Sequence, residues 1–137
     1  MRESIFRGKS KNNNEWIYGF YSPLIWYPSF KQTPSIKTFK GVDMEINPET
    51  LGQYTGIKDK NGTKIFEGDI LCMTFKDEWA NNEERKVYYF IKFNDGMFAT
   101  FYYDFLDEVE EDRLCEALIE VDKLEVVGNI YDNPQLL

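Results

Sequence analysis

Apolar and polar side chains alternate in several segments of the chain, and the apolar runs stay short, which is the pattern of β-strands. Turn signals such as Asn61-Gly62 and Asp95-Gly96 separate some of these segments. Aromatic residues favour strands, and they make up 17% of the 137 residues. We therefore expect a mostly-β fold, with strands over residues 16–21, 70–75, 87–93, 97–103 and 124–130.

The N-terminal part of the chain predicts a hairpin followed by irregular structure. A polar turn cluster at residues 8–14 lies between Phe6 and the strand at residues 16–21, as in a hairpin. Residues 22–41 contain three prolines, which disfavour a long helix or a central strand. We expect an irregular excursion with short strands there.

Three further segments predict local structure of other kinds. Asn47-Pro48 is typical of a single helical turn that Asn47 caps. Residues 76–84 are polar and charged and are expected to form a loop. Residues 104–120 carry apolar residues at an imperfect helical spacing, which predicts one short helix.

The centre of the chain combines a hairpin signal with charged residues. Asn61-Gly62 predicts a two-residue turn in which both residues have positive φ and Asp59 lies opposite Lys64. The simplest interpretation of Asp59, Lys60 and Lys64 is a solvated turn. A charged binding loop is the alternative, because loops often carry function.

The tripeptide Glu67-Gly68-Asp69 leads into the strand at residues 70–75. Gly68 permits a positive φ at this turn, and the Asp69 carboxylate is placed to accept hydrogen bonds from nearby backbone amides. Glu67 and Asp69 could also serve as a general acid and base. Such a pair needs a pocket that the sequence does not show, so the structural interpretation is favoured.

Residues 87–103 are expected to form a hairpin with two apolar faces. A two-residue turn would place Phe93 opposite Phe98 and Ile91 opposite Thr100. The opposite face then carries Tyr88, Phe90, Phe101 and Tyr103. Polar residues would alternate along a face in water, so this second face must be covered by another segment, by a partner subunit or by stacked bases. We predict a homo-oligomer, most simply a symmetric dimer or small ring, with some of these four residues at its interface.

The available side chains exclude several kinds of chemistry. Histidine is absent, and the two cysteines, Cys72 and Cys115, are far apart in the sequence. Ser–His and Cys–His catalysis and zinc sites that need imidazole are therefore excluded. The acidic run at residues 104–112 matches no EF-hand spacing and is better explained as a solvated helix face. We expect a non-catalytic protein without metal or cofactor, with buried, reduced thiols.

The net charge of −8 is unevenly distributed. Residues 1–64 hold 10 Lys and Arg against 6 Asp and Glu (+4), and residues 65–137 hold 6 against 18 (−12). The acidic half repels a phosphate backbone, so charge-driven nucleic-acid binding is disfavoured. No secretory signal is recognisable and no apolar run approaches the ~20 residues of a membrane span, so we expect a cytoplasmic protein without a membrane partner.

Three stretches of the sequence resemble the YopX family of phage and prophage proteins. The longest is a central motif with Gln53, Tyr54, Thr55, Gly56, Asp59, Asn61, Gly62, Gly68 and Asp69. The opening at residues 2–9 and the closing segment at residues 126–134 also agree with the family. The resemblance implies a phage or prophage origin and a β-rich fold with a small SH3-like barrel. It supplies no catalytic or ligand-binding residue.

We therefore expect a single YopX-like domain over residues 1–137, with N-terminal strands and the excursion in residues 1–64 and a barrel-like part in residues 65–137. The leading hypothesis is a non-catalytic interaction module that self-associates or binds a phage or host protein. The alternative is a nucleic-acid-binding module that uses the basic N-terminal half and exposed aromatic residues. The central motif marks either a function or the geometry of its turns.

Overall fold

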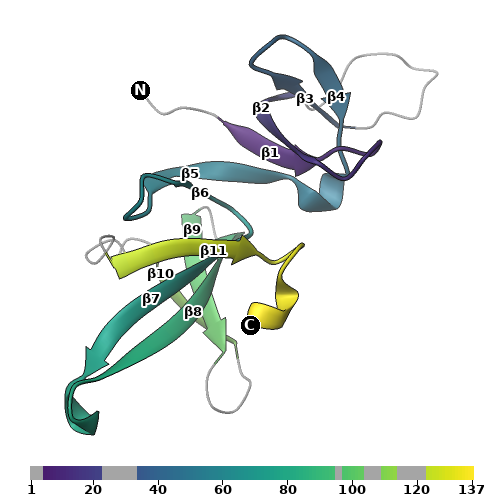
Figure 1. Cartoon of the computed structure of the whole chain (residues 1–137). Coiled ribbons are helices and arrows are strands. Elements are labelled where there is room, and N and C mark those ends of the chain that lie inside the picture. Colours follow the sequence, from purple (N-terminus) through teal and green to yellow (C-terminus); the bar gives the residue numbers. More distant parts are fainter. Residues whose placement is uncertain (1–4, 23–33, 95–96, 104–108, 114–122) are drawn as a thin grey trace. The chain divides into compact units, whose positions relative to one another are not determined.

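The described part of the chain is mostly β-strand, as its alternation predicts (Figure 1). The computed structural model describes residues 5–22, 34–94, 97–103, 109–113 and 123–137. In these parts of the chain the strands form two antiparallel sheets rather than a closed barrel, so the SH3-like detail is not confirmed. No helix among the described residues is long and apolar enough to cross a membrane.

The chain divides into two compact units, Met1–Tyr54 and Thr55–Leu137. The N-terminal unit contains strands β1 (Phe6–Lys9), β2 (Trp16–Ser22), β3 (Ser35–Thr38), β4 (Asp43–Glu45) and the start of β5 (Gly52–Lys58). They are hydrogen-bonded in the order β4-β3-β2-β1-β5. β1 and β2 form the predicted hairpin. The core of this unit is Ile17, Ile36 and Ile46.

A single 3-10 turn, η1 (Pro48–Thr50), follows β4, as Asn47-Pro48 predicts. The Asn47 Oδ1 accepts a hydrogen bond from the Glu49 N–H at 3.3 Å and so caps the turn. The Thr50 Oγ1 accepts from the Lys9 N–H at 2.8 Å and donates to the Asn47 carbonyl at 2.7 Å. These bonds fasten the turn to the end of β1.

The second unit contains the rest of β5 and a five-stranded sheet in the order β10-β9-β8-β7-β11. Its other elements are β6 (Lys64–Phe66), β7 (Asp69–Asp77), η2 (Glu78–Ala80), β8 (Glu83–Asn94), β9 (Met97–Tyr103), β10 (Val109–Arg113), β11 (Leu124–Asn129) and η4 (Pro134–Leu136). The core consists of Ile65, Leu71, Ile91 and Leu124. Cys72 is buried and free, as predicted, and Cys115 lies outside the described residues.

The register of the central hairpin agrees with the sequence prediction. Phe93 pairs with Phe98 and Ile91 pairs with Thr100 across β8 and β9. The loop predicted at residues 76–84 is shorter than expected, because β7 and β8 continue pairing to Asp77↔Glu83. Only the short η2 turn and its neighbours connect these two strands.

The helix predicted over residues 104–120 is wrong at residues 109–113, which form strand β10. β10 pairs antiparallel with β9 from Val109↔Tyr103 to Arg113↔Ala99 and forms an edge of the sheet. Charged residues suit an edge strand because they hinder pairing with another chain. The remainder of the predicted helix lies outside the described residues, as do residues 23–33 of the excursion.

Candidate functional site

The central motif is built around the carboxylate of Asp59, which is buried rather than solvated. Its Oδ1 accepts hydrogen bonds from the N–H groups of Asn61 at 2.8 Å and Thr63 at 2.9 Å. Its Oδ2 accepts from the Val126 N–H in β11 at 2.9 Å. Burial alone would raise the pKa of this carboxyl, but the bonds from Val126, Thr63 and Asn61, with the nearby Lys60 charge, outweigh it. The pKa of Asp59 therefore lies below the ordinary value of an aspartate.

The turn after Asp59 differs from the predicted two-residue loop. Gly62 has a φ of 80°, as predicted, but Asn61 is not among the described non-glycine residues with positive φ. Asp59 and Thr63 are hydrogen-bonded across the hairpin, and the Gly62 N–H donates to the Asp59 carbonyl at 3.0 Å. The prediction that Asp59 lies opposite Lys64 is therefore wrong. Residues 59–63 form a wider turn instead, in which Gly62 has the left-handed conformation and both hydrogen bonds are made.

The same turn is bound to β11 by backbone and side-chain contacts. The Lys60 N–H donates to the Leu124 carbonyl at 3.1 Å, and the Lys60 Nζ lies 3.7 Å from Glu125 Oε2. The Asn61 Nδ2 lies 3.4 Å from Glu125 Oε1. These contacts, together with the Asp59–Val126 bond, show that the charged residues of the turn connect two strands that are far apart in the sequence.

The remaining motif residues also make bonds within the fold. Asp69 is 2% exposed, and its Oδ2 accepts from the Phe66 N–H at 2.7 Å, which confirms its predicted structural role. Gly68 has the predicted positive φ, 90°. The Thr55 Oγ1 donates to the Ile65 carbonyl at 2.8 Å, and the Tyr54 N–H donates to the Ile5 carbonyl at 2.8 Å. The half-buried Gln53 pairs with Phe6, and Gly56 has a φ of 90°.

The predicted interface residues of the central hairpin are in different surroundings. Phe90 is 6% exposed, so the chain itself covers this side chain, and it does not belong to a free surface. Tyr88 is half-buried on the same strand. The side chains of Phe101 and Tyr103 lie outside the described part of the structure, and their place at an interface stays a prediction.

Exposed apolar side chains gather instead on the N-terminal unit. We call this surface the aromatic patch and define it as Tyr18, Phe20, Phe39 and Val42, which are 43%, 52%, 63% and 53% exposed. The rings of Phe20 and Phe39 meet edge to face, with centroids 5.6 Å apart and an interplanar angle of 85°. The turn between β3 and β4 supplies Phe39 and Val42, and β2 supplies the other two.

A hollow of about 450 Å³ lies beside these residues. Its lining consists of Trp16, Ile17, Tyr18, Thr38, Phe39, Lys40, Val42 and Met44. Sequence reasoning missed this surface, although a signal was present: Trp16, Tyr18 and Phe20 recur at every second position of β2. Such spacing places three aromatic rings on one side of a strand.

Basic residues share the face that carries the aromatic patch. In the antiparallel register Arg7 lies opposite Tyr18, Lys9 opposite Trp16 and Lys37 opposite Phe20. The Arg7 guanidinium carbon and the Lys9 Nζ lie 4.6 Å and 5.5 Å from the Trp16 ring centroid, as in cation–π contacts. Arg7 is buried, so the positive charge at the surface of the patch comes from Lys9 and Lys37.

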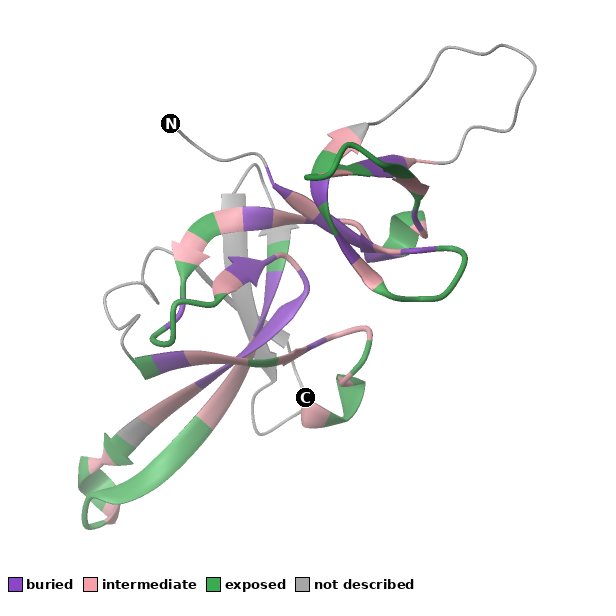
Figure 2. Cartoon of the chain, turned by 45° about the horizontal axis from the view of Figure 1, so that its top comes forward, coloured by how far each residue is buried: buried purple, intermediate pink, exposed green. Residues whose placement is uncertain are grey.

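Another exposed aromatic residue, Trp79, lies at the tip of the β7–β8 hairpin. Its side chain is 99% exposed. In the described part of the chain, β11 pairs with β7 only as far as Met73, and β9 pairs with β8 only from Phe90 onward. Toward the tip, β7 and β8 are therefore paired only with each other among the described strands. Figure 1 shows it extending beyond the other strands of this unit, and Figure 2 shows its exposed residues in green.

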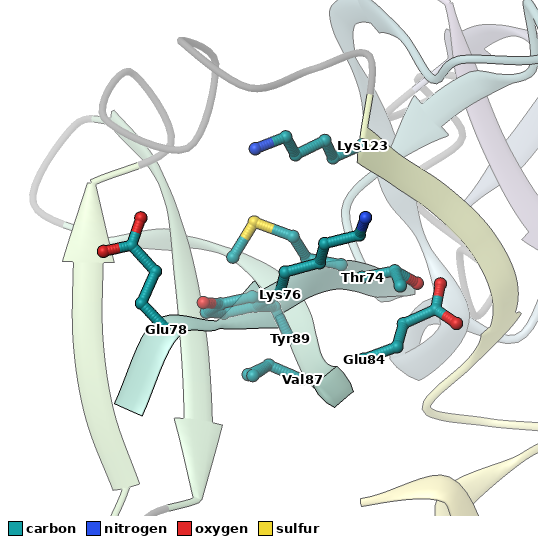
Figure 3. A pocket seen from close by; sticks show the side chains of 8 residues that line it. Thr74, Lys76, Glu78, Glu84, Val87, Tyr89 and Lys123 are labelled. Carbon is teal, nitrogen blue, oxygen red and sulfur yellow. The ribbon is translucent and has the colours of Figure 1, made fainter. Parts of the chain in front are cut away.

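A larger hollow of about 800 Å³ lies along the same hairpin (Figure 3). Its lining consists of Met73, Thr74, Lys76, Glu78, Glu84, Val87, Tyr89 and Lys123. The two lysines balance the two glutamates, and Figure 3 shows the glutamates on opposite sides of the view. Among the described residues no group of His, Cys, Asp and Glu could hold a metal ion. This lining offers no net preference for an anion or a cation.

Comparison with known proteins agrees with the sequence motifs. The solved structure of protein EF1440 from Enterococcus faecalis is similar to this chain, with 30% sequence identity and a TM-score of 0.58. The alignment covers 100% of this chain and 99% of the other. No curated protein matches. The family model of the YopX protein matches residues 5–137, and the chain therefore belongs to the YopX family.

Proposed function

We propose that this chain is a non-catalytic protein-interaction module that self-associates through the aromatic patch. The observation that carries the proposal is the gathering of Tyr18, Phe20, Phe39 and Val42 beside a hollow of about 450 Å³. Large aromatic side chains are enriched at protein interfaces, where their burial stabilises the complex. Contiguous exposed apolar surface on a protein commonly marks such an interface.

The central motif has a different role in this proposal. Both carboxylate oxygens of Asp59 accept backbone hydrogen bonds, and Asp69 accepts another, so these carboxylates stabilise turns. The phage or prophage origin that the family resemblance implies is consistent with a small binding protein. We include this origin in the proposal.

Self-association is tested by light scattering on a size-exclusion column, from about 1 µM to about 100 µM, which spans moderate and weak affinities. We expect a mass above 16.3 kDa that rises with concentration. Val42→Ser should lower this mass, because it removes an apolar group from the patch. Val127→Ser is the matched control, since Val127 is also exposed but lies on β11. A wild-type monomer at every concentration would refute the proposal.

The earlier interface prediction is tested in the same assay. Tyr88 is half-buried and stays a candidate interface residue. Tyr88→Lys would lower the mass if this residue lies between subunits, because lysines of two copies would repel each other. An unchanged mass would leave the aromatic patch as the proposed contact.

A single-stranded nucleic acid is the second candidate partner. The favouring observation is that Lys9 and Lys37 lie opposite aromatic residues of β2, and exposed rings with nearby positive charge are an arrangement on which bases stack. Fluorescence anisotropy with a labelled single strand tests it. Binding that weakens steeply with added salt and is lost in Phe20→Ser would support this candidate.

A further inference from the structure

We propose that Trp79 of one copy inserts into the hollow beside the aromatic patch of a second copy, so that the chain associates head to tail. This inference rests on the proposed self-association and names the two surfaces that meet. The contact joins two different surfaces, because Trp79 belongs to the second unit and the hollow belongs to the N-terminal unit.

The tip that carries Trp79 is ordered by its own hydrogen bonds. Asp77 Oδ1 accepts from the Trp79 N–H at 3.0 Å, and Asp77 Oδ2 lies 2.8 Å from Arg85 Nε. The Asn82 N–H donates to the Asp77 carbonyl at 2.9 Å, and Asn81 adopts a φ of 57°. A tip with a defined backbone loses little further entropy on binding, which favours it as an anchor.

The exposure of Trp79 is the observation that favours a partner for this side chain. At 99% exposure the indole contacts almost nothing in its own chain, whereas tryptophan is highly buried on average. Tryptophan is also among the residues that dominate binding energy at interfaces. A rigid aromatic side chain at the end of a ribbon therefore fits a hollow lined by apolar and aromatic groups.

The hollow of the N-terminal unit has the matching chemistry. Phe39 and Val42 lie at its rim with more than half of their surface exposed, and Trp16 and Tyr18 complete its aromatic lining. Aromatic rings pack well edge to face, the geometry that Phe20 and Phe39 already show. Its volume of about 450 Å³ exceeds what one indole needs.

Charge favours the same pairing. Residues 76–86 at the tip carry four acidic and three basic side chains, a net charge of −1, and Arg85 is paired with Asp77. Lys40 lines the hollow, and the N-terminal unit holds 7 Lys and Arg against 5 Asp and Glu, a net charge of +2. The second unit holds 9 against 19, a net charge of −10. The acidic second unit of one copy is therefore attracted to the basic N-terminal unit of another, whereas two second units repel each other.

A head-to-tail contact has a consequence that a symmetric one lacks. Each copy contributes one tip and one hollow, so copies join into rings or open chains. Removing either surface from every copy abolishes association. A copy without the tip and a copy without the patch still retain one complete contact between them.

The experiment uses three variants of the full chain: Trp79→Ala, Phe39→Ser and the double variant. We expect each single variant to be at least about 30-fold weaker in self-association, the least that a dominant interface residue contributes. An equimolar mixture of the two single variants should give a dimer of two 16.3 kDa chains. The double variant should stay monomeric, alone and in mixtures. Trp79→Phe, which keeps an aromatic ring, should restore most of the association.

Two of three outcomes separate this inference from the proposed function. A wild-type monomer would refute both. Wild-type mass in Trp79→Ala, with a monomeric Phe39→Ser, would refute the head-to-tail contact and leave self-association through the patch intact. A mixture of the two variants that stays monomeric would also refute the head-to-tail contact. Unchanged melting temperatures confirm that the variants fold, since both residues are exposed.

Discussion

The Asp59 carboxylate provides the sharpest test of what holds the second unit together. Asp59→Asn keeps the shape of the side chain but replaces one oxygen by an amide N–H₂ group. One oxygen can still accept from Asn61 and Thr63, whereas the amide group then faces the Val126 N–H donor. A hydrogen bond to a charged group contributes about 1.5–3 kcal/mol, so we expect a loss of about 2 kcal/mol in the free energy of unfolding.

Urea unfolding followed by circular dichroism measures this loss. With a denaturant dependence of about 2 kcal/mol per molar, the midpoint should fall by about 1 M at pH 7. Asp43→Asn is the matched control, because Asp43 is exposed on β4, and its midpoint should stay close to that of the wild type.

The loss should also depend on pH with a defined sign. The pKa of Asp59 is lower in the folded chain than its ordinary value, so the folded state favours the carboxylate. Its contribution is complete above the unfolded pKa of about 4 and is lost as the pH falls through the lower folded pKa. The difference between wild type and Asp59→Asn should therefore shrink below about pH 4. Equal midpoints at pH 7, or a difference that grows in acid, would refute this account.

Three further predictions concern turns and binding. Gly62→Val should destabilise the chain by about 1 kcal/mol or more, because a β-branched residue is strained at a φ of 80°; an unchanged melting temperature would contradict the turn. Asn129→Ala should cost about 2 kcal/mol in urea unfolding, since Asn129 Oδ1 accepts from the N–H groups of Tyr131 at 3.0 Å and Asp132 at 2.9 Å. Random duplex DNA at ~150 mM salt should bind no tighter than micromolar in fluorescence anisotropy, because the net charge is −8; nanomolar binding would reverse this reasoning.

Local signals in the sequence determined most of the strands and several turns. Alternating side chains and turn residues act over a few neighbouring positions, which is why the β1–β2 hairpin and the pairing of Phe93 with Phe98 were predictable. The Asn47 cap and the Asp69 bond to the Phe66 N–H likewise join residues close in sequence. Family membership was also readable, because the motif residues occur in order along the chain.

Only the tertiary structure decided how distant segments meet. Asp59 becomes a buried acceptor because Val126, 67 residues away, donates to it, and Lys60 bonds to Leu124, which favours a wider turn than Asn61-Gly62 suggested. Residues 109–113 became a strand because β9 offers an edge, although their own spacing is ambiguous. The pairing of β2 with β3 assembled the aromatic patch, and Trp79 is exposed at a tip that lies beyond the described pairing of β11 with β7 and of β9 with β8. Each of these contacts depends on a segment far away in the sequence, which no local pattern identifies. The burial of Asp59 and the exposure of Trp79 were therefore decided by the packing of distant segments.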